Sequence, residues 1–256
     1  MAPFFFAAFM FYFAGSLCLA MIPLEADTKV CQKKKQVGEK TVGFCTLVTR
    51  PMVLLPVLMN IMIQLQLTYL EPVLALRLKQ HFKLSLEMNN AFFILLPANY
   101  LFGAVLYQVF FQRIQKIDNK VVIITATLCS FVACVCCGPS LTLHMKDDIR
   151  LIAFGFGFLG FTGVIIGIPL IAEQNAMTIH YFGEEKAKQL SDLNASIFAA
   201  SQAFGLIIGP IFGTYANHYY GFRFVSDIMA GITLLSALLY LLFGGGLNAM
   251  MSPLVK

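Results

Sequence analysis

Apolar residues run almost without interruption through seven stretches of the chain. These stretches are 3–24, 52–76, 90–112, 119–140, 151–173, 193–215 and 224–246. A helix needs about 20 consecutive apolar residues to cross the hydrocarbon core of a bilayer. Backbone groups in lipid must be hydrogen-bonded within each segment, and the runs lack the alternation of membrane β-strands. The pattern therefore predicts an all-α membrane protein with seven transmembrane helices.

Polar residues inside the second stretch recur on one helical face. Asn60, Gln64, Thr68 and Glu71 follow spacings of four, four and three, and Pro72 comes directly after the glutamate. Such a stripe faces either a water-filled cavity or a neighbouring helix to which it hydrogen-bonds. Both alternatives stay open for Asn60 and Gln64. For Glu71 we expect a function, because carboxylates inside membrane spans are usually functional.

The six stretches after residue 50 divide into two triplets, 52–140 and 151–246. The first helix of each triplet has an interior proline near a carboxylate: Glu71-Pro72 in one triplet, Pro169 and Glu173 in the other. Three crossings place the start of the second triplet on the opposite side, so the triplets are related by inversion. Interrupted helices at matching places of inverted repeats point to a transporter site. Glu173 lies near the end of its span, so a solvated helix end is the alternative to a binding role.

Glycines in two other spans indicate close helix packing. In "GLIIGPIFG", Gly209 and Gly213 are four residues apart, and Pro210 allows a kink. In "FGFGFLG", the GxGxxG spacing does not indicate a dinucleotide site, because it lies inside an apolar run rather than between a strand and a helix.

Composition supports the membrane assignment, with 59% hydrophobic and 12% charged residues. Of the 18 Lys and Arg residues, 12 fall on one side of the predicted membrane. They are Lys29, Lys33, Lys34, Lys35, Lys40, Arg50, Arg113, Lys116, Lys120, Lys186, Lys188 and Lys256. This bias predicts an outside N-terminus and a cytosolic C-terminus. The net charge of +5 thus calls for no nucleic-acid partner.

The sequence contains no motif that indicates an enzyme. The chain has no nucleophile elbow, HExxH motif or phosphate loop. Its seven cysteines lack the spacing of a metal site. We therefore expect neither a cofactor nor a metal, and no enzymatic activity.

Several stretches resemble the major facilitator superfamily, in particular its vesicular polyamine transporter-like branch. They are "YLEPVLALRL", "CGPSLTLHMKDDIRLI", "IGIPLIAEQ" and "FGLIIGPIFGTYANHYYGF". The resemblance covers roughly residues 50–245. It implies that 1–24 is the sixth helix of such a transporter, 25–50 its central cytosolic loop and 51–256 its C-terminal six-helix lobe. The loop "LYQVFFQRIQKIDNK" departs from the family pattern, because it keeps Arg113 but lacks the usual glycine and aspartate.

The resemblance also implies a function: proton-coupled exchange of small organic cations, polyamine-like, in a vesicular or other endomembrane. Val164 and Ala199-Ala200-Ser201 stand where monoamine transporters have acids, which argues against a monoamine substrate. The expected partners are a small organic cation, protons, the lipid bilayer and an N-terminal lobe. The alternatives are a non-transporting structural membrane subunit and a seven-helix receptor.

Overall fold

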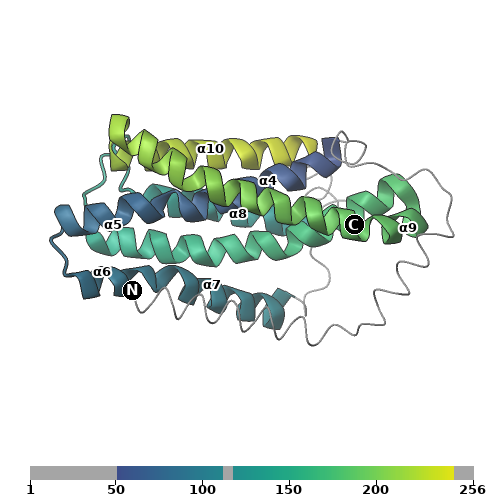
Figure 1. Ribbon diagram of the computed structural model, residues 1–256, viewed down its shortest axis with the longest axis horizontal. Coiled ribbons are helices and arrows are strands. Elements are labelled where there is room, and N and C mark those ends of the chain that lie inside the picture. Colours follow the sequence, from purple (N-terminus) through teal and green to yellow (C-terminus); the bar gives the residue numbers. More distant parts are fainter. Residues whose placement is uncertain (1–50, 112–117, 245–256) are drawn as a thin grey trace, which may run out of the picture. The chain divides into compact units, whose positions relative to one another are not determined.

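The computed structural model describes residues 51–111 and 118–244, and within these ranges the secondary structure is helical (Figure 1). The predicted helix 3–24, the loop 25–50 and the C-terminal residues after 244 lie outside the described ranges. The elements, in chain order, are α4 (Pro51–Thr68), α5 (Leu70–Gln80), α6 (Leu86–Phe93), α7 (Leu95–Leu106), a π-helical turn η1 (Tyr107–Phe111), α8 (Asn119–Cys137), α9 (Ile149–Tyr220) and α10 (Phe222–Phe243).

Six segments of the described residues are long and apolar enough to cross a membrane. They are Val53–Gln80, Leu86–Val109, Asn119–Cys137, Ile149–Glu184, Leu190–Tyr220 and Phe222–Phe243. Each corresponds to one of the six predicted spans after residue 50, so these six predictions are confirmed. The seventh, 3–24, falls outside the described residues.

Two glycines mark the reversals of the chain around the second half of α9. Gly183, with φ 78° and ψ 163°, separates the two spans that α9 contains. Gly221, with φ 79°, separates α9 from α10. Positive φ costs glycine little because it has no Cβ. The two ends of the bundle are called the Gly183 end and the Gly221 end below.

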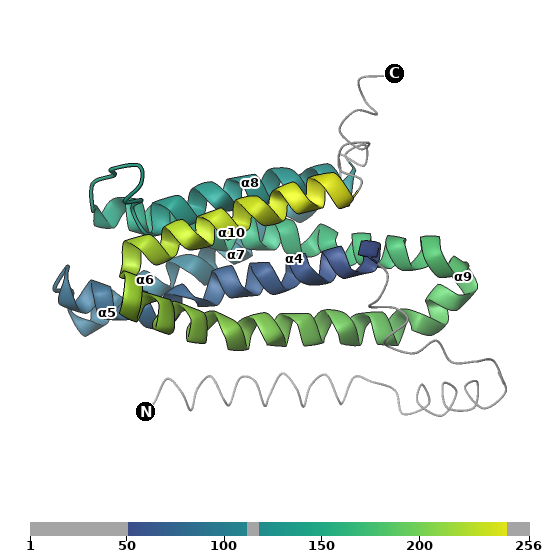
Figure 2. The same cartoon turned by 90° about the horizontal axis from the view of Figure 1, so that it is seen from above.

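The chain runs back and forth between these ends, so that α4 and α9 begin at opposite ends of the bundle (Figure 2). Helix α9 is central to the packing and contacts α4, α7 and α8 extensively. Buried apolar side chains form one cluster that includes Leu74, Leu78 and Phe156 and a second that includes Ile123 and Leu170. The topology is that expected of two three-helix units that enter the bundle from opposite ends.

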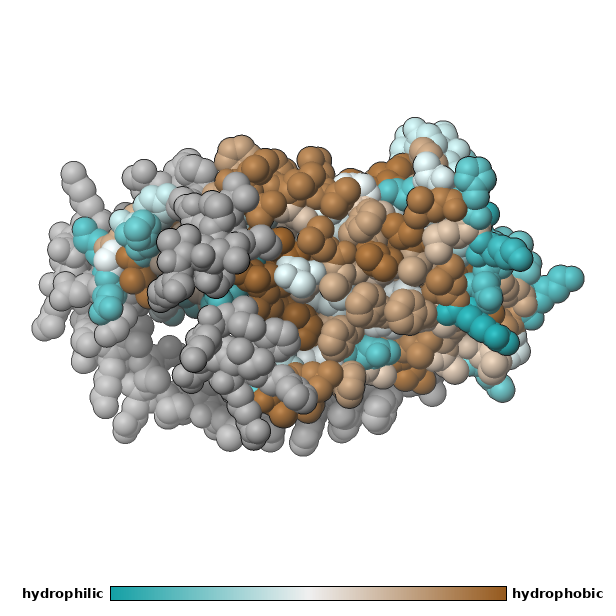
Figure 3. All heavy atoms as spheres, turned by 180° about the vertical axis from the view of Figure 1, so that it is seen from behind, coloured by the Kyte–Doolittle hydropathy of each residue, from teal (hydrophilic) through white to brown (hydrophobic). Residues whose placement is uncertain are grey.

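Large apolar side chains also cover the outside of the bundle. Leu101, Ile207, Ile211 and Leu242 are each more than half exposed. Figure 3 shows one such face, with hydrophobic side chains over its middle and hydrophilic side chains toward both ends. An exterior this apolar suits contact with lipid or with another membrane segment.

The loop between α8 and α9 is held in place by α10. The Arg223 guanidinium donates to the carbonyls of Pro139 (2.6 Å), Ser140 (3.3 Å) and Met145 (2.6 Å). One turn along α10, the Asp227 carboxylate accepts from the backbone and hydroxyl of Thr142 (3.4 and 2.8 Å). A single planar guanidinium thus binds three carbonyls of the loop, of which that of Ser140 also accepts from the Met145 N–H (3.1 Å).

Replacing Arg223 by lysine should therefore destabilise the protein although the charge is kept. An ammonium group lacks the fork that reaches three carbonyls, and we expect a loss of about 1–2 kcal/mol. Thermal unfolding in detergent measures it. The control is Arg150→Lys, since Arg150 is exposed and its guanidinium forms none of the described hydrogen bonds. Equal melting temperatures for the two variants would contradict this role of Arg223.

Candidate functional site

The first span is interrupted just before Glu71 and Pro72. Helix α4 ends at Thr68 and α5 begins at Leu70, with Tyr69 between them. Tyr69 keeps right-handed helical dihedrals (φ −61°, ψ −28°), and its N–H still donates to the Leu65 carbonyl (3.0 Å). Pro72 has no N–H, so it cannot donate to the Thr68 carbonyl four residues earlier. The interruption is thus a missing hydrogen bond in a backbone that stays helical.

Glu71 lies directly after this interruption, and both Glu71 and Pro72 are exposed. None of the ion pairs formed by the described residues includes Glu71. A carboxylate within a membrane span that has no cationic partner is available to bind a proton or a cation from outside the bundle.

The other residues of the polar stripe face the second half of α9. Asn60 is 1% exposed, and its amide donates to the Phe198 carbonyl (3.0 Å) and the Ser201 hydroxyl (2.6 Å). Thr68 is also buried and donates its hydroxyl to the Gln64 carbonyl (2.8 Å). The contacts of Asn60 are those of helix packing, which was one of its two alternatives.

The glycines of α9 allow this close approach. A Cβ atom placed on Gly205 would lie 2.6 Å from the Gln64 Cβ. One on Gly209 would lie 2.0 Å from the Thr68 hydroxyl, and one on Gly213 would lie 2.1 Å from the Tyr69 carbonyl oxygen. At these three glycines α9 lies so close to α4, up to the interruption, that a Cβ atom would not fit without a shift.

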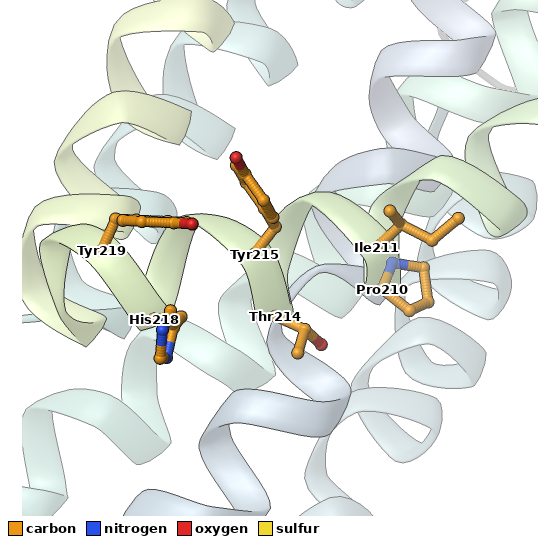
Figure 4. A pocket seen from close by; sticks show the side chains of 6 residues that line it. All are labelled: Pro210, Ile211, Thr214, Tyr215, His218 and Tyr219. Atoms are coloured by element: carbon orange, nitrogen blue, oxygen red, sulfur yellow. The ribbon is translucent and has the colours of Figure 1, made fainter.

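Pro210 lies on the open side of the same helix. With Ile211, Thr214, Tyr215, His218 and Tyr219 it lines a shallow surface depression (Figure 4). All six lining residues belong to α9. The ring centroids of Tyr215 and Tyr219 are 4.9 Å apart. The depression is formed by the outside of one helix and does not enclose a ligand-sized space.

Glu173 occupies a different setting from Glu71. It is 5% exposed, and its carboxylate lies 3.5 Å from the Lys120 ammonium in the first turn of α8. Pro169, one turn earlier, is buried. The ion pair joins α8 to the first half of α9 near the Gly183 end, whereas α5 runs from Glu71 to the Gly221 end. The structure does not bring the two glutamates together.

Amide side chains beside Glu173 join the two halves of α9. Gln174 donates to the side-chain oxygen of Asn194 (2.7 Å), and Asn194 donates to Asn175. The side chains of Gln174 and Asn194 are buried, and that of Asn175 is exposed. Together with the Lys120–Glu173 pair they connect α8, the first half of α9 and the second half of α9.

Removing Lys120 alone should lower the stability of the protein more than removing Lys120 and Glu173 together. Lys120→Met leaves the buried Glu173 carboxylate without a cation, which costs about 3–5 kcal/mol when a buried pair is broken. Adding Glu173→Gln should restore most of the stability. Melting temperatures of the two single variants and the double variant measure this coupling. Additive losses in the double variant would show that the two side chains do not interact.

Three contacts between distant parts of the chain could not be predicted from the sequence. The sequence indicates Lys120 only as a topology signal, and the buried Gln66 lies outside the polar stripe. The Arg77 guanidinium forms an ion pair with Asp147 at the Gly221 end. The Asp147 carboxylate also lies 3.3 Å from Nε2 of His81. Among the described residues, no cluster of His, Cys, Asp and Glu is placed to hold a metal ion.

Comparison with known proteins shows a resemblance to membrane transporters. The chain is similar to major-facilitator-type transporters, and it is a multi-pass helical membrane protein. It is 25% identical over 233 residues to the MFS-type transporter SLC18B1 of Rattus norvegicus and 24% identical over 233 residues to that of Mus musculus. Each alignment covers 91% of this chain and 50% of the relative. The chain thus spans about half the length of the curated relatives it matches. No family model matches it. No solved structure matches it either.

Proposed function

We propose that the chain forms one six-helix lobe of a transporter that exchanges protons for small organic cations, polyamine-like in chemistry. The observation that carries this proposal is the exposed carboxylate of Glu71, which lies at the interruption of a membrane span and takes part in none of the described ion pairs. The similarity to major-facilitator transporters supports transport over the receptor and subunit alternatives.

Glu71 can perform the exchange with two states. When protonated it is neutral, and when ionised it attracts a cation; lipid and a poorly hydrated site disfavour an ionised carboxylate without a cation. A cycle that alternates between these states moves one proton against one positive charge. The interrupted backbone, and Gln64 two turns earlier on the same face of the helix, would supply further polar groups to an ammonium ligand.

Glu173 is the second candidate, and the Lys120 ammonium already compensates its charge. We propose that this pair closes the Gly183 end of the lobe and opens when a proton or a cation competes for the carboxylate. Alternating access requires two lobes around a midplane site. We therefore propose an N-terminal lobe as partner, a vesicular or other endomembrane location, and a cytosolic Gly183 end and C-terminus.

Uptake into membrane vesicles tests the proposal. The chain is produced alone and together with a candidate N-terminal lobe, and labelled spermidine uptake is measured with an acidic vesicle interior. We expect uptake that a protonophore abolishes and that unlabelled polyamines reduce. Vesicles that bind no polyamine and accumulate none in either form would overturn the transporter proposal in favour of a structural subunit.

A further inference from the structure

Gln66 is a buried amide of α4 whose nitrogen and oxygen are both hydrogen-bonded, and it lies outside the proposed site. It is 3% exposed. Its amide nitrogen donates to the Thr233 hydroxyl on α10, and its oxygen accepts from the Ser130 hydroxyl on α8 (2.9 Å). Both partners are buried as well, at 0% and 1% exposed. One side chain of α4 therefore binds two other helices.

The network fixes the orientation of the Gln66 amide. Thr233 donates its own hydroxyl hydrogen to the Met229 carbonyl (2.7 Å), so toward Gln66 it can only accept. The amide NH₂ must therefore face Thr233, which leaves the amide oxygen for Ser130. Reversing the amide would place its oxygen against the Thr233 hydroxyl, which could donate to it only by giving up its bond to the Met229 carbonyl.

Gln66 and the polar stripe lie on opposite faces of α4. Gln66 is two residues from both Gln64 and Thr68, which corresponds to a rotation of about 200° at 3.6 residues per turn. The stripe faces the second half of α9, and Gln66 faces α8 and α10. Helix α4 is thus held on two faces within the turn that precedes the interruption at Tyr69.

We propose that Gln66 is a positioning residue for transport: its amide fixes the rotation of α4 about its axis and so places Glu71 for the cation. The proposal rests on the function proposed for Glu71. An apolar residue at 66 would keep the helix in the membrane but would not select one rotation, because apolar contacts are not directional. A hydrogen-bonded amide is directional.

The alternative is that Gln66 only stabilises the bundle, and a pair of variants separates the two. Gln66→Leu leaves the Ser130 and Thr233 hydroxyls without their partner and should lower the melting temperature by several degrees. The triple variant Gln66→Leu, Ser130→Ala, Thr233→Val removes all three polar groups and should recover most of that loss, since replacing both partners is nearly neutral. The constraint that the Gln66 amide places on the rotation of α4 is absent from both variants, whereas the bonds of Asn60 to α9 remain in both.

We expect KM for spermidine to rise about tenfold in both variants while the maximal rate per folded molecule changes less, because the misplaced group is the one that binds the cation. The matched control is Thr127→Val. Thr127 is 2% exposed, and among the described residues its hydroxyl donates within its own helix, to the Ile123 carbonyl (2.7 Å). KM in this control should equal that of the wild type. Recovery of KM together with stability in the triple variant would overturn the positioning role.

A second readout does not depend on transport. Glu71→Cys is labelled with a membrane-impermeant maleimide in the wild-type and triple-variant backgrounds, and the signal of the same chains without the introduced cysteine is subtracted. We expect labelling rates that differ several-fold. Equal rates would overturn the proposal even if uptake were active, and wild-type vesicles without cation uptake would instead refute the proposed function.

If Gln66→Leu does not accumulate, Thr233→Val alone decides the question. It removes one of the two bonds to the amide and leaves Gln66 and Ser130 in place. A raised KM and an altered labelling rate at position 71 support positioning. Wild-type values for both overturn it.

Discussion

Glu71→Gln is expected to abolish proton-driven cation uptake while leaving the protein folded. The substitution keeps the size of the side chain and its hydrogen-bonding capacity but removes the charge that titrates. Positioned proton-transfer groups typically contribute a hundredfold or more, so uptake should fall by about that factor. Stability should change little, because Glu71 is exposed and takes part in none of the described ion pairs.

The control is the same chemical change at Glu87. Glu87 is exposed in the first turn of α6, and its carboxylate forms none of the described ion pairs. Glu87→Gln should transport at the wild-type rate. Labelled spermidine uptake is compared at equal amounts of folded protein. Wild-type uptake by Glu71→Gln would show that the carboxylate is not the exchanging group.

The pattern of apolar residues was sufficient to locate the six described spans. Helix length in a membrane is set by the thickness of the hydrocarbon, so a run of about 20 apolar residues predicts a span directly. The same argument fails at helix ends. The span predicted as 151–173 continues to Glu184, because helical hydrogen bonding extends past the apolar run into polar sequence. Hydropathy therefore predicts which residues lie in lipid, but it does not predict the residue at which the helix ends.

The sequence predicted only those features of the site that follow from the spacing of residues along one helix. The four-residue spacing placed Asn60, Gln64 and Thr68 on one face, and the structure shows that face turned toward α9. The identity of the facing helix, and the link from Glu173 to Lys120, are set by packing between residues far apart in the chain. Gln66 was overlooked because its partners come from two other helices. Single-residue polarity carries no information about such partners.

The packing of α9 against α4 provides the second large expected effect. Gly213→Ala adds a Cβ atom that would lie 2.1 Å from the Tyr69 carbonyl oxygen. That oxygen belongs to the backbone, so it cannot move aside as a flexible side chain can. The two helices must separate, and we expect a loss of at least about 3 kcal/mol, the upper part of the range for overpacking. The melting temperature and the yield of folded protein should both fall.

A glycine with free space around it gives the matched control. A Cβ atom on Gly231, inside α10, would meet nothing within 4 Å. Gly231→Ala should be neutral or stabilising by up to about 1 kcal/mol, because alanine is the better helix former. The contrast between the two substitutions isolates the steric effect from helix propensity. If Gly213→Ala melted as late as Gly231→Ala, the close contact between α9 and Tyr69 would be refuted, and with it the packing that places α9 against the interruption before Glu71.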